Sequence, residues 1–421
     1  MVYVINQNGQ PLMPTENHRM VRLLLKNKKA KVVRRTPFTI KLMVKTKEFI
    51  QPVTLGVDAG SKKVGLSAST KTKELFATEL LPRNDVVKNL STRREFRRAR
   101  RNRKTRYRKA RFNNRVHSKH KGWLAPSVEV KIQEHITAIN RICKILPIAK
   151  VEVETAEFDL QLIKAVEAGL PVPVGEDYQK GEQLGYYNVR QYVFHRDGYT
   201  CQHCGAHGDG VKFEVHHLES RKTGGNAPDN LITLCSHCHE LVTNGAIIDL
   251  NKRKRKSTRD ATFMGIMRKT LMERLRNELT IPVFETKGYI TKYVRETHKL
   301  PKSHMIDALC IAGHPTAKRI DSSYTLKPVR NHNRQLHRAS ILKGGVRKAN
   351  QAAKYVKGFR LFDKVLYRNQ ECFVWGRRTS GSMKLKTLDS AFLKDGVSWK
   401  YLKLLERSSN YLIERIARKS G

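Results

Sequence analysis

The sequence predicts a multidomain α/β protein. Short runs of strand-like composition alternate with segments of helical periodicity along most of the chain. With 421 residues, of which 39% are hydrophobic, the chain can form more than one packed core. The 83 Lys and Arg residues exceed the 37 Asp and Glu residues by 46, and this excess favours binding to a polyanion.

Membrane insertion is not expected. No stretch of the sequence approaches the roughly 18 consecutive apolar residues of a membrane-spanning helix. We therefore expect a cytoplasmic protein with no membrane contact.

Residues 1–52 form the first candidate domain. A strand-like run at residues 3–5 and a turn at Asn8 and Gly9 precede the tract 10–14, which reads QPLMP. A helix is expected at residues 19–28, and two further strand-like segments follow it.

Three short apolar runs in residues 53–84 predict an antiparallel meander. They span residues 53–57, 64–69 and 75–81, at the spacing of consecutive hairpins. Asp58 directly follows the first run, so the meander carries an acid at the end of its first strand.

Residues 85–121 contain a dense basic segment. Between Lys88 and Lys121 there are 16 Lys and Arg residues and one acid, Glu95, with no Pro or Gly. A solvated basic surface is one interpretation. We favour a long arginine-rich helix lying along a nucleic-acid backbone, because the segment has no helix breakers and lies between structured regions. The candidate nucleic-acid-binding residues are Arg93, Arg94, Arg97, Arg98, Arg100, Arg101, Arg103, Arg106 and Arg108.

Residues 122–170 and 257–316 contain further acids at defined positions. A helix at 127–146 precedes a strand at 149–155, which carries Glu152 and Glu154 on one face, and spacing alone cannot choose between them. After a helix at 264–279 and a short strand at 282–284, a helix at 304–312 places His304 and Asp307 on one face.

Residues 171–256 contain two CxxC pairs. Cys201 and Cys204 are separated by thirty residues from Cys235 and Cys238. Four thiolates in two such pairs predict a tetrahedral structural Zn²⁺ site.

Histidine and asparagine residues inside this cysteine frame provide the parts of a phosphodiesterase site. One neutral imidazole can accept a proton from water while others bind a divalent cation, and an amide can orient the first ring. The order of residues resembles the HNH nuclease module with its ββα-metal site. The resemblance implies that His217 is the general base, that His216 and His239 bind Mg²⁺, and that Asn230 positions the base. His203, His207 and His237 are expected to be surface residues.

The separate acids resemble the RuvC version of the RNase H-like fold, in which three acids and a histidine bind two Mg²⁺ ions. Carried over, these residues are Asp58, Glu154, His304 and Asp307, and the resemblance favours Glu154 over Glu152.

Together these features resemble the IscB family of transposon-associated RNA-guided DNA endonucleases, relatives of the type II CRISPR effectors. The tract at 10–14 matches the element that names the family's PLMP domain. The implied fold is an RNase H-like (RuvC) core split in three, with an inserted HNH module, an arginine-rich bridge helix and a small β-rich C-terminal domain. The implied domains are 1–52 (PLMP), 53–84, 122–170 and 257–316 (RuvC), 85–121 (bridge helix), 171–256 (linkers and HNH) and 317–421 (reader of a target-adjacent motif).

The resemblance also implies partners and a division of labour. The protein would act as a monomeric ribonucleoprotein with a guide (omega) RNA and cut double-stranded target DNA. HNH would cut the target strand and RuvC the displaced strand, while Arg377, Arg378 and Lys384 would face the target-adjacent motif. Two alternatives are a guide-independent HNH endonuclease of the homing or restriction type, and a catalytically inactive nucleic-acid-binding transposon regulator.

Overall fold

The computed structural model describes residues 1–46, 49–102, 120, 122–155, 171, 188–218, 228–246, 250, 259–330, 340–341, 347–348, 353–389 and 391–418. The chain divides into two compact units. Unit 1 comprises Met1–Phe158 and Met267–Gly421, and unit 2 comprises Asp159–Ile266. Several separate sheets and helices make up the two units, so the prediction of an α/β multidomain protein is confirmed.

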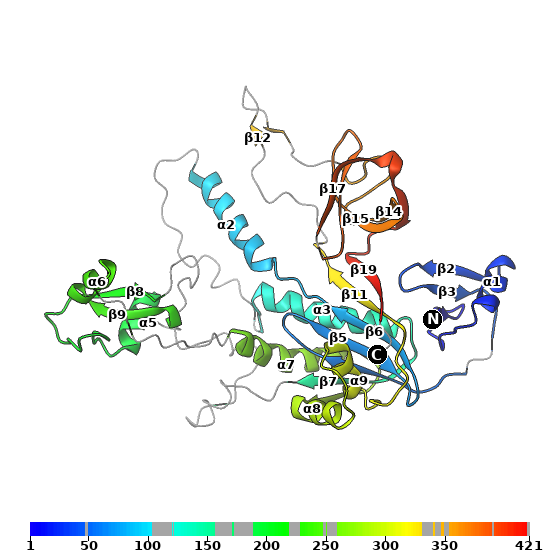
Figure 1. The fold of residues 1–421 in the computed structure, drawn as a ribbon, viewed down its shortest axis with the longest axis horizontal. Coiled ribbons are helices and arrows are strands. Elements are labelled where there is room, and N and C mark those ends of the chain that lie inside the picture. Colours follow the sequence, from blue (N-terminus) through cyan, green and yellow to red (C-terminus); the bar gives the residue numbers. More distant parts are fainter. Residues whose placement is uncertain are drawn as a thin grey trace. The chain divides into compact units, whose positions relative to one another are not determined.

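The described strands of unit 1 include a central seven-stranded sheet in the order β10-β7-β4-β5-β6-β11-β19 (Figure 1). Strands β4, β5 and β6 form the predicted antiparallel meander. Strand β7 pairs with β4 in parallel, and β10 pairs with β7 in parallel. The strands span Val53–Asp58 (β4), Val64–Ser69 (β5), Glu74–Leu80 (β6), Ile148–Thr155 (β7), Val283–Lys287 (β10), Ser322–Pro328 (β11) and Tyr411–Ala417 (β19).

Helix α9 packs against the meander at very short range. A Cβ atom at Gly56 would lie 1.9 Å from the carbonyl oxygen of Ala308, and one at Gly65 would lie 1.8 Å from that of His304. Only glycine permits this approach. The helices of unit 1 span Val86–Asn102 (α2), Pro126–Cys143 (α3), Arg259–Glu278 (α7, which enters unit 1 at Met267), Gly288–Thr297 (α8) and His304–Ile311 (α9).

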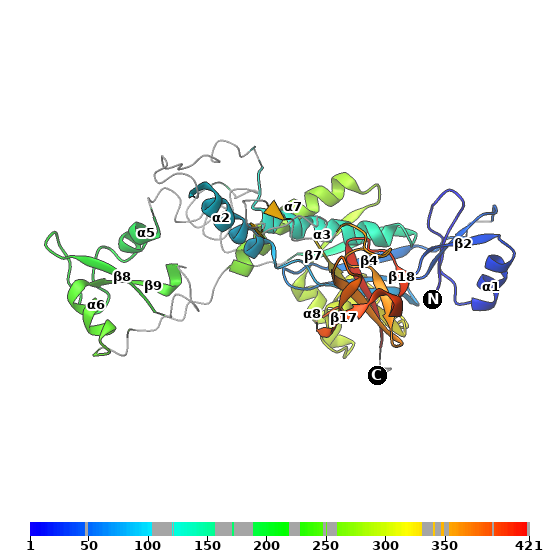
Figure 2. The same cartoon turned by 90° about the horizontal axis from the view of Figure 1, so that it is seen from above.

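The N-terminal segment forms a small lobe at one end of unit 1 (Figure 2). Its sheet has the order β1-β3-β2 and packs against helix α1 through Val4, Val21 and Ile40. The elements span Tyr3–Ile5 (β1), His18–Lys26 (α1), Ala30–Arg34 (β2) and Thr39–Leu42 (β3).

The C-terminal residues form a five-stranded antiparallel sheet in the order β17-β16-β15-β14-β18. Its core contains Val365, Cys372, Val374 and Leu385, which are inaccessible to solvent. The elements span Lys364–Tyr367 (β14), Gln370–Arg377 (β15), Ser382–Lys386 (β16), Phe392–Ser398 (β17), Trp399–Tyr401 (η3) and Lys403–Glu406 (β18). A short two-stranded ladder, Ser340–Ile341 (β12) with Arg347–Lys348 (β13), precedes them.

Unit 2 contains a β-hairpin followed by a helix. Strands β8 (Phe213–His217) and β9 (Leu231–Cys235) pair antiparallel, and helix α6 (Ser236–Thr243) follows β9 directly (Figure 1). Helix α5 (Val189–Arg196) and the short helix η2 (Pro228–Asn230) complete its described elements. Across the described parts of both units, every helix is too short or too polar to cross a membrane.

Candidate active sites

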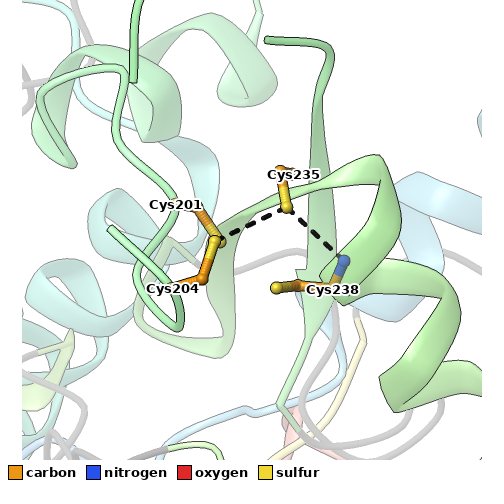
Figure 3. Close-up of side chains that lie close together, drawn as sticks. All are labelled: Cys201, Cys204, Cys235 and Cys238. Carbon is orange, nitrogen blue, oxygen red and sulfur yellow. Dashed lines mark hydrogen bonds between the residues drawn. The ribbon is translucent and has the colours of Figure 1, made fainter. Parts of the chain in front are cut away.

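The four cysteines of unit 2 form a compact cluster. Their sulfur atoms all lie within 4.8 Å of one another, which brings the two predicted pairs together (Figure 3). Cys235 ends β9 and caps α6, since its sulfur accepts a hydrogen bond from the N–H of Cys238 at 3.5 Å. Burial alone would raise the pKa of the Cys201 thiol, but backbone N–H groups around its sulfur lower this pKa to about 6. Burial and the neighbouring sulfur atoms raise the pKa of Cys238, and the pKa of Cys204 is raised as well, so Cys201 is the member of the cluster whose pKa favours the thiolate that a metal ion binds.

The hairpin brings His216 next to His239. Their ring centroids are 5.3 Å apart, with the rings nearly perpendicular. Burial and the neighbouring imidazoles of His239 and His217 lower the pKa of His216, which favours the neutral ring that a cation requires. Glu214 lies two residues before His216 on the same strand face, and its Oε2 is 3.1 Å from Nδ1 of His239.

His217 ends β8, and Asn230 directly precedes β9. His217 is opposite Leu231 in the hairpin register, and Asn230 immediately precedes Leu231. The backbone N–H of Leu218 donates to the carbonyl oxygen of Asn230 at 2.9 Å, which closes this end of the hairpin. His217 is the last residue of β8, and its imidazole lies near enough to His216 to lower the pKa of that histidine.

In unit 1, strand pairing selects Glu154 rather than Glu152 as the partner of Asp58. Asp58 is directly opposite Glu154 in the parallel register of β4 and β7, whereas Glu152 is opposite Gly56. Burial raises the pKa of Glu154, and the carboxylates of Asp58 and Asp307 raise it further. Glu152 instead forms an ion pair with Lys150 at 2.5 Å.

Helix α9 brings His304 and Asp307 to the same end of the sheet. Nδ1 of His304 is 2.6 Å from Oδ2 of Asp58, and this hydrogen bond raises the pKa of His304. The hydroxyl of Ser303 caps the helix by accepting from the N–H of Ile306, which fixes where the helix begins. Burial raises the pKa of Asp307 despite the positive charge of Arg295 nearby.

The acids approach one another without forming a closed ligand set. Among the described residues, the four cysteines form a group of three or more His, Cys, Asp or Glu side chains whose donor atoms lie within 4.8 Å of one another, and the acids do not form one. Asp58, Glu154 and Asp307 therefore share a site but are not at coordination distance. A cavity of about 360 Å³ is lined by one of these acids, Asp307, together with His304, Lys63 and others.

Four residues near these sites were not identified from the sequence. Arg295 on α8 lies 3.4 Å from Asp307, and Glu79 on β6 lines the same cavity and pairs with Lys63 at 2.7 Å. His135 on α3 is fully buried, and burial lowers its pKa to about 4. Glu214, the fourth, contacts His239. No local sequence motif indicates a functional role for the first three residues. Glu214 was predictable, because it lies two residues before His216 and so shares its strand face.

The candidate nucleic-acid-binding residues are only partly described. Arg93, Arg94 and Arg98 are exposed on α2. Arg97 is half-buried, and Arg100 and Arg101 belong to the helix without described side chains. Arg103, Arg106, Arg108 and the rest of the predicted bridge helix lie outside the described residues.

The three candidate readers of a target-adjacent motif lie on β15, β16 and the turn between them. Arg378 forms a two-pronged ion pair with Asp395 at 2.9 and 3.0 Å, and Arg377 donates to the carbonyl of Lys354. Lys384 is opposite Gly376 in the register. Both arginines thus have partners within the protein, which the sequence did not indicate.

Comparison with known proteins identifies two segments. Residues 2–181 match the family model described as RRXRR protein, and residues 97–101 of this chain read RRARR. Residues 201–245 match the HNH endonuclease model. A probable HNH endonuclease of Lactococcus phage SK1 is 42% identical over 74 residues, which cover 16% of this chain and 74% of the phage protein. The chain belongs to the HNH endonuclease family.

The prediction of an endonuclease is therefore confirmed, and the two family models fit an IscB-like protein. Solved structures with similarity to this HNH endonuclease include Streptococcus thermophilus Cas9 in complex with AGGA PAM, at 13% identity and a TM-score of 0.29. That match covers 48% of this chain and 27% of the Cas9 chain. The type II-C Cas9 of Actinomyces naeslundii matches at 11% identity and a TM-score of 0.17, over 63% of this chain and 60% of that one. The family assignment rests on the sequence matches.

Proposed function

We propose that this protein is an RNA-guided DNA endonuclease with two nuclease sites. The observation that carries the proposal is the presence of two chemically different groups of candidate catalytic residues in separate units of one chain. Unit 2 holds the histidines beside the β8–β9 hairpin, and unit 1 holds the acids and His304 at one end of its sheet. Two sites of different chemistry suit a substrate with two strands to cut.

In unit 2, the residues suit proton transfer beside a bound cation. His217 acts as general base, accepting a proton from the attacking water at an imidazole nitrogen, and Asn230 holds the ring in orientation. His216 and His239 would hold Mg²⁺, and the ion pair between Oε2 of Glu214 and Nδ1 of His239, 3.1 Å apart, leaves Nε2 of His239 for the metal. When bound, Mg²⁺ supplies stabilisation of the charge that develops on the scissile phosphate.

In unit 1, the donor set fits the same hard cation. Asp58, Glu154 and Asp307 offer carboxylate oxygens, which Mg²⁺ prefers. Oδ1 of Asp307 is buried and makes no hydrogen bond, and its ion-pair partner, Nη1 of Arg295, lies 3.4 Å away, so a cation bound at this oxygen would share it with Arg295. His304 orients Asp58 through their hydrogen bond and can take up a proton during strand cleavage. The RNase H-like (RuvC) fold of this unit, split along the chain, is part of the same proposal.

The four-cysteine cluster has the geometry of a structural zinc site. A Zn–S bond of about 2.3 Å in a regular tetrahedron places sulfur atoms about 3.8 Å apart. The sulfur atoms of Cys204 and Cys235 are 3.7 Å apart. We infer that Zn²⁺ here stabilises the junction between β9 and α6, which carries His239.

The guide RNA accounts for the large positive charge. A net charge of +46 is more than a short DNA contact requires, and arginines of α2 project into solvent. If base pairing with a guide supplies sequence recognition, the protein needs mainly backbone contacts and a small reader of duplex DNA. The resulting ribonucleoprotein is proposed to act as a monomer in the cytoplasm.

Strand-specific cleavage tests this division of labour. Target DNA labelled separately on each strand should be nicked only on the displaced strand by His217→Ala, and only on the target strand by Asp58→Ala. Glu152→Gln is the matched control for Glu154→Gln, since only the latter should stop cutting of the displaced strand. Loss of cutting on both strands in each single variant, with DNA binding retained, would refute two independent sites.

A guide-independent HNH endonuclease is the second candidate function. The phage relative supports this candidate, because it is itself a probable HNH endonuclease and is 42% identical to this chain over 74 residues. Sequencing of RNA that copurifies with the protein separates the candidates. A discrete bound RNA that is required for cleavage supports the guided enzyme, whereas full and specific cleavage by RNA-free protein supports the second candidate. An RNA-bound protein that cuts neither strand would support the inactive regulator.

A further inference from the structure

A cavity of about 940 Å³ lies in unit 1 between the candidate acid site and the C-terminal sheet. Its walls come from the β4–β5 loop, the segment leading into α2, the end of β11, and two aromatic residues of the C-terminal region. This volume is near the upper end of the roughly 300–1,000 Å³ of small-molecule sites, so a nucleotide fits. His304 is one of its lining residues, and nothing proposed above uses the others.

The lining of this cavity carries a net positive charge, although Arg83 forms an ion pair with the lining acid Asp85 at 2.9 Å. Among its lining residues are five lysine and arginine side chains and one acid, Asp85. Lys63 is held by Glu79 at 2.7 Å, and Nζ of Lys327 donates to the carbonyl of Leu388 at 3.1 Å, so these cations have fixed positions. A cluster of cations with low-dielectric walls attracts phosphate. The five are Lys62, Lys63, Arg83, Lys327 and Arg330.

Phe362 and Trp375 form an aromatic corner in the cavity lining, and both half-buried rings pack against a buried hydrophobic cluster of the C-terminal region. Their ring centroids are 5.3 Å apart at an interplanar angle of 78°. Phe362 has a φ of +67°, which a bulky side chain rarely adopts. Its N–H donates to the carbonyl of Val374 at 2.7 Å, which holds this backbone. Nζ of Lys386 lies 5.1 Å from the Trp375 ring centroid and adds positive charge at the corner.

We propose that this cavity binds one unpaired nucleotide of the DNA strand that the acid site cuts. The base packs against the Phe362–Trp375 corner, and the backbone phosphates lie beside the cavity's lysines and arginines. Base–aromatic contact requires a base that is neither paired nor stacked on its neighbours, and a displaced single strand supplies one. The inference rests on the proposed function, because it takes the acids of unit 1 as a nuclease site.

The position of the cavity explains how such a strand reaches the acids. The smaller cavity of about 360 Å³ shares Lys63 and His304 with the large one and continues to Asp307. A nucleotide anchored at the aromatic corner therefore directs the adjoining phosphate past His304 toward the acids. The contact is insensitive to sequence, since every base has an apolar face.

Binding of single-stranded DNA tests the proposal without requiring cleavage. The probe is oligodeoxythymidine of about 12 nucleotides, within the range of known single-strand grooves, and affinity for the full-length chain is measured in EDTA. Trp375→Ala should weaken binding about tenfold, as expected for loss of a stacked base, whereas Trp375→Phe should retain most of the affinity. The matched control is Tyr401→Ala, which removes an aromatic side chain that is 74% exposed and lies outside the cavity lining.

Photochemical cross-linking locates the base directly. The same oligonucleotide with one 5-iodouracil should cross-link to the peptide containing Phe362 or Trp375 in the unmodified protein, where folding of a variant is not in question. Cross-links only at other sites, or equal loss of affinity in Trp375→Ala and Tyr401→Ala, would overturn the proposal. Preferential binding of oligouridine at the same corner would overturn the DNA assignment in favour of RNA. Both assays measure binding without cleavage. A protein that does not cut DNA can therefore still confirm nucleotide binding in the cavity, and a protein that cuts DNA can still refute it.

Discussion

The contact between Gly65 and helix α9 makes the acid site sensitive to a single added methyl group. In Gly65→Ala, the new Cβ would lie 1.8 Å from the carbonyl oxygen of His304, whereas real Cβ atoms essentially never come within 3.0 Å of another heavy atom. The difference, 3.0 − 1.8 = 1.2 Å, is the least by which β5 and the start of α9 must separate. His304 and Asp307 both lie in this turn, so both move relative to Asp58.

A displacement of about 1 Å in a catalytic constellation costs on the order of 100-fold in rate. We therefore expect Gly65→Ala to slow cutting of the displaced strand about 100-fold and to leave cutting of the target strand unchanged. Overpacking of this kind also costs about 1–3 kcal/mol in stability, which thermal unfolding should detect.

The assay is strand-specific cleavage of labelled target DNA by the ribonucleoprotein. Gly210→Ala is the matched control, because a Cβ at Gly210 has no heavy atom within 4 Å. Circular dichroism and zinc content establish that the variant is folded. Cleavage of both strands at the parent rate by a folded Gly65→Ala protein would refute the close packing of α9 and the assignment of its residues to the site.

Three further predictions concern stability, metal and RNA. Burial raises the pKa of Glu134 from 4.5 to about 7, so the folded state loses stability as pH rises through this window. Between these two pKa values the loss amounts to roughly 3 kcal/mol. The variant Glu134→Gln keeps an acceptor for the N–H of Arg83 but carries no charge. It should therefore unfold at a higher temperature than the parent at pH 8, and at the same temperature as the parent near pH 4.5. If the variant and the parent had the same thermal unfolding curve at pH 8 as well as at pH 4.5, this prediction would be contradicted. Elemental analysis should find about one zinc per chain, and Cys201→Ser should lose it together with target-strand cleavage, whereas normal cleavage by zinc-free protein would exclude a structural zinc. Joint replacement by Gln of four α2 arginines should weaken RNA binding and flatten the slope of log K against log salt by about 3, and an unchanged slope would mean that this helix does not contact RNA. The four are Arg93, Arg94, Arg97 and Arg98.

Features encoded by short sequence spacing were predictable from the sequence. The two CxxC pairs, the adjacent His216 and His217, and the β4–β5–β6 meander each depend on residues a few positions apart. Hairpin geometry and helical periodicity translate such spacing directly into positions in space. The excess of basic residues likewise follows from composition alone and indicates a nucleic-acid partner.

Only the tertiary structure decided which acids face one another. Glu152 and Glu154 have the same alternation, so spacing could not separate them, and the preference for Glu154 came from the family resemblance. The parallel register of β7 against β4, strands about ninety residues apart in the chain, is what sets Glu154 opposite Asp58. Arg295 reaches Asp307 because α8 packs beside α9. The aromatic corner lines the same cavity as His304 because the C-terminal sheet joins the same unit. The register and packing of segments that are distant in the chain depend on burial of the apolar faces of entire strands and helices. A local sequence pattern does not determine which distant face each of them will pack against.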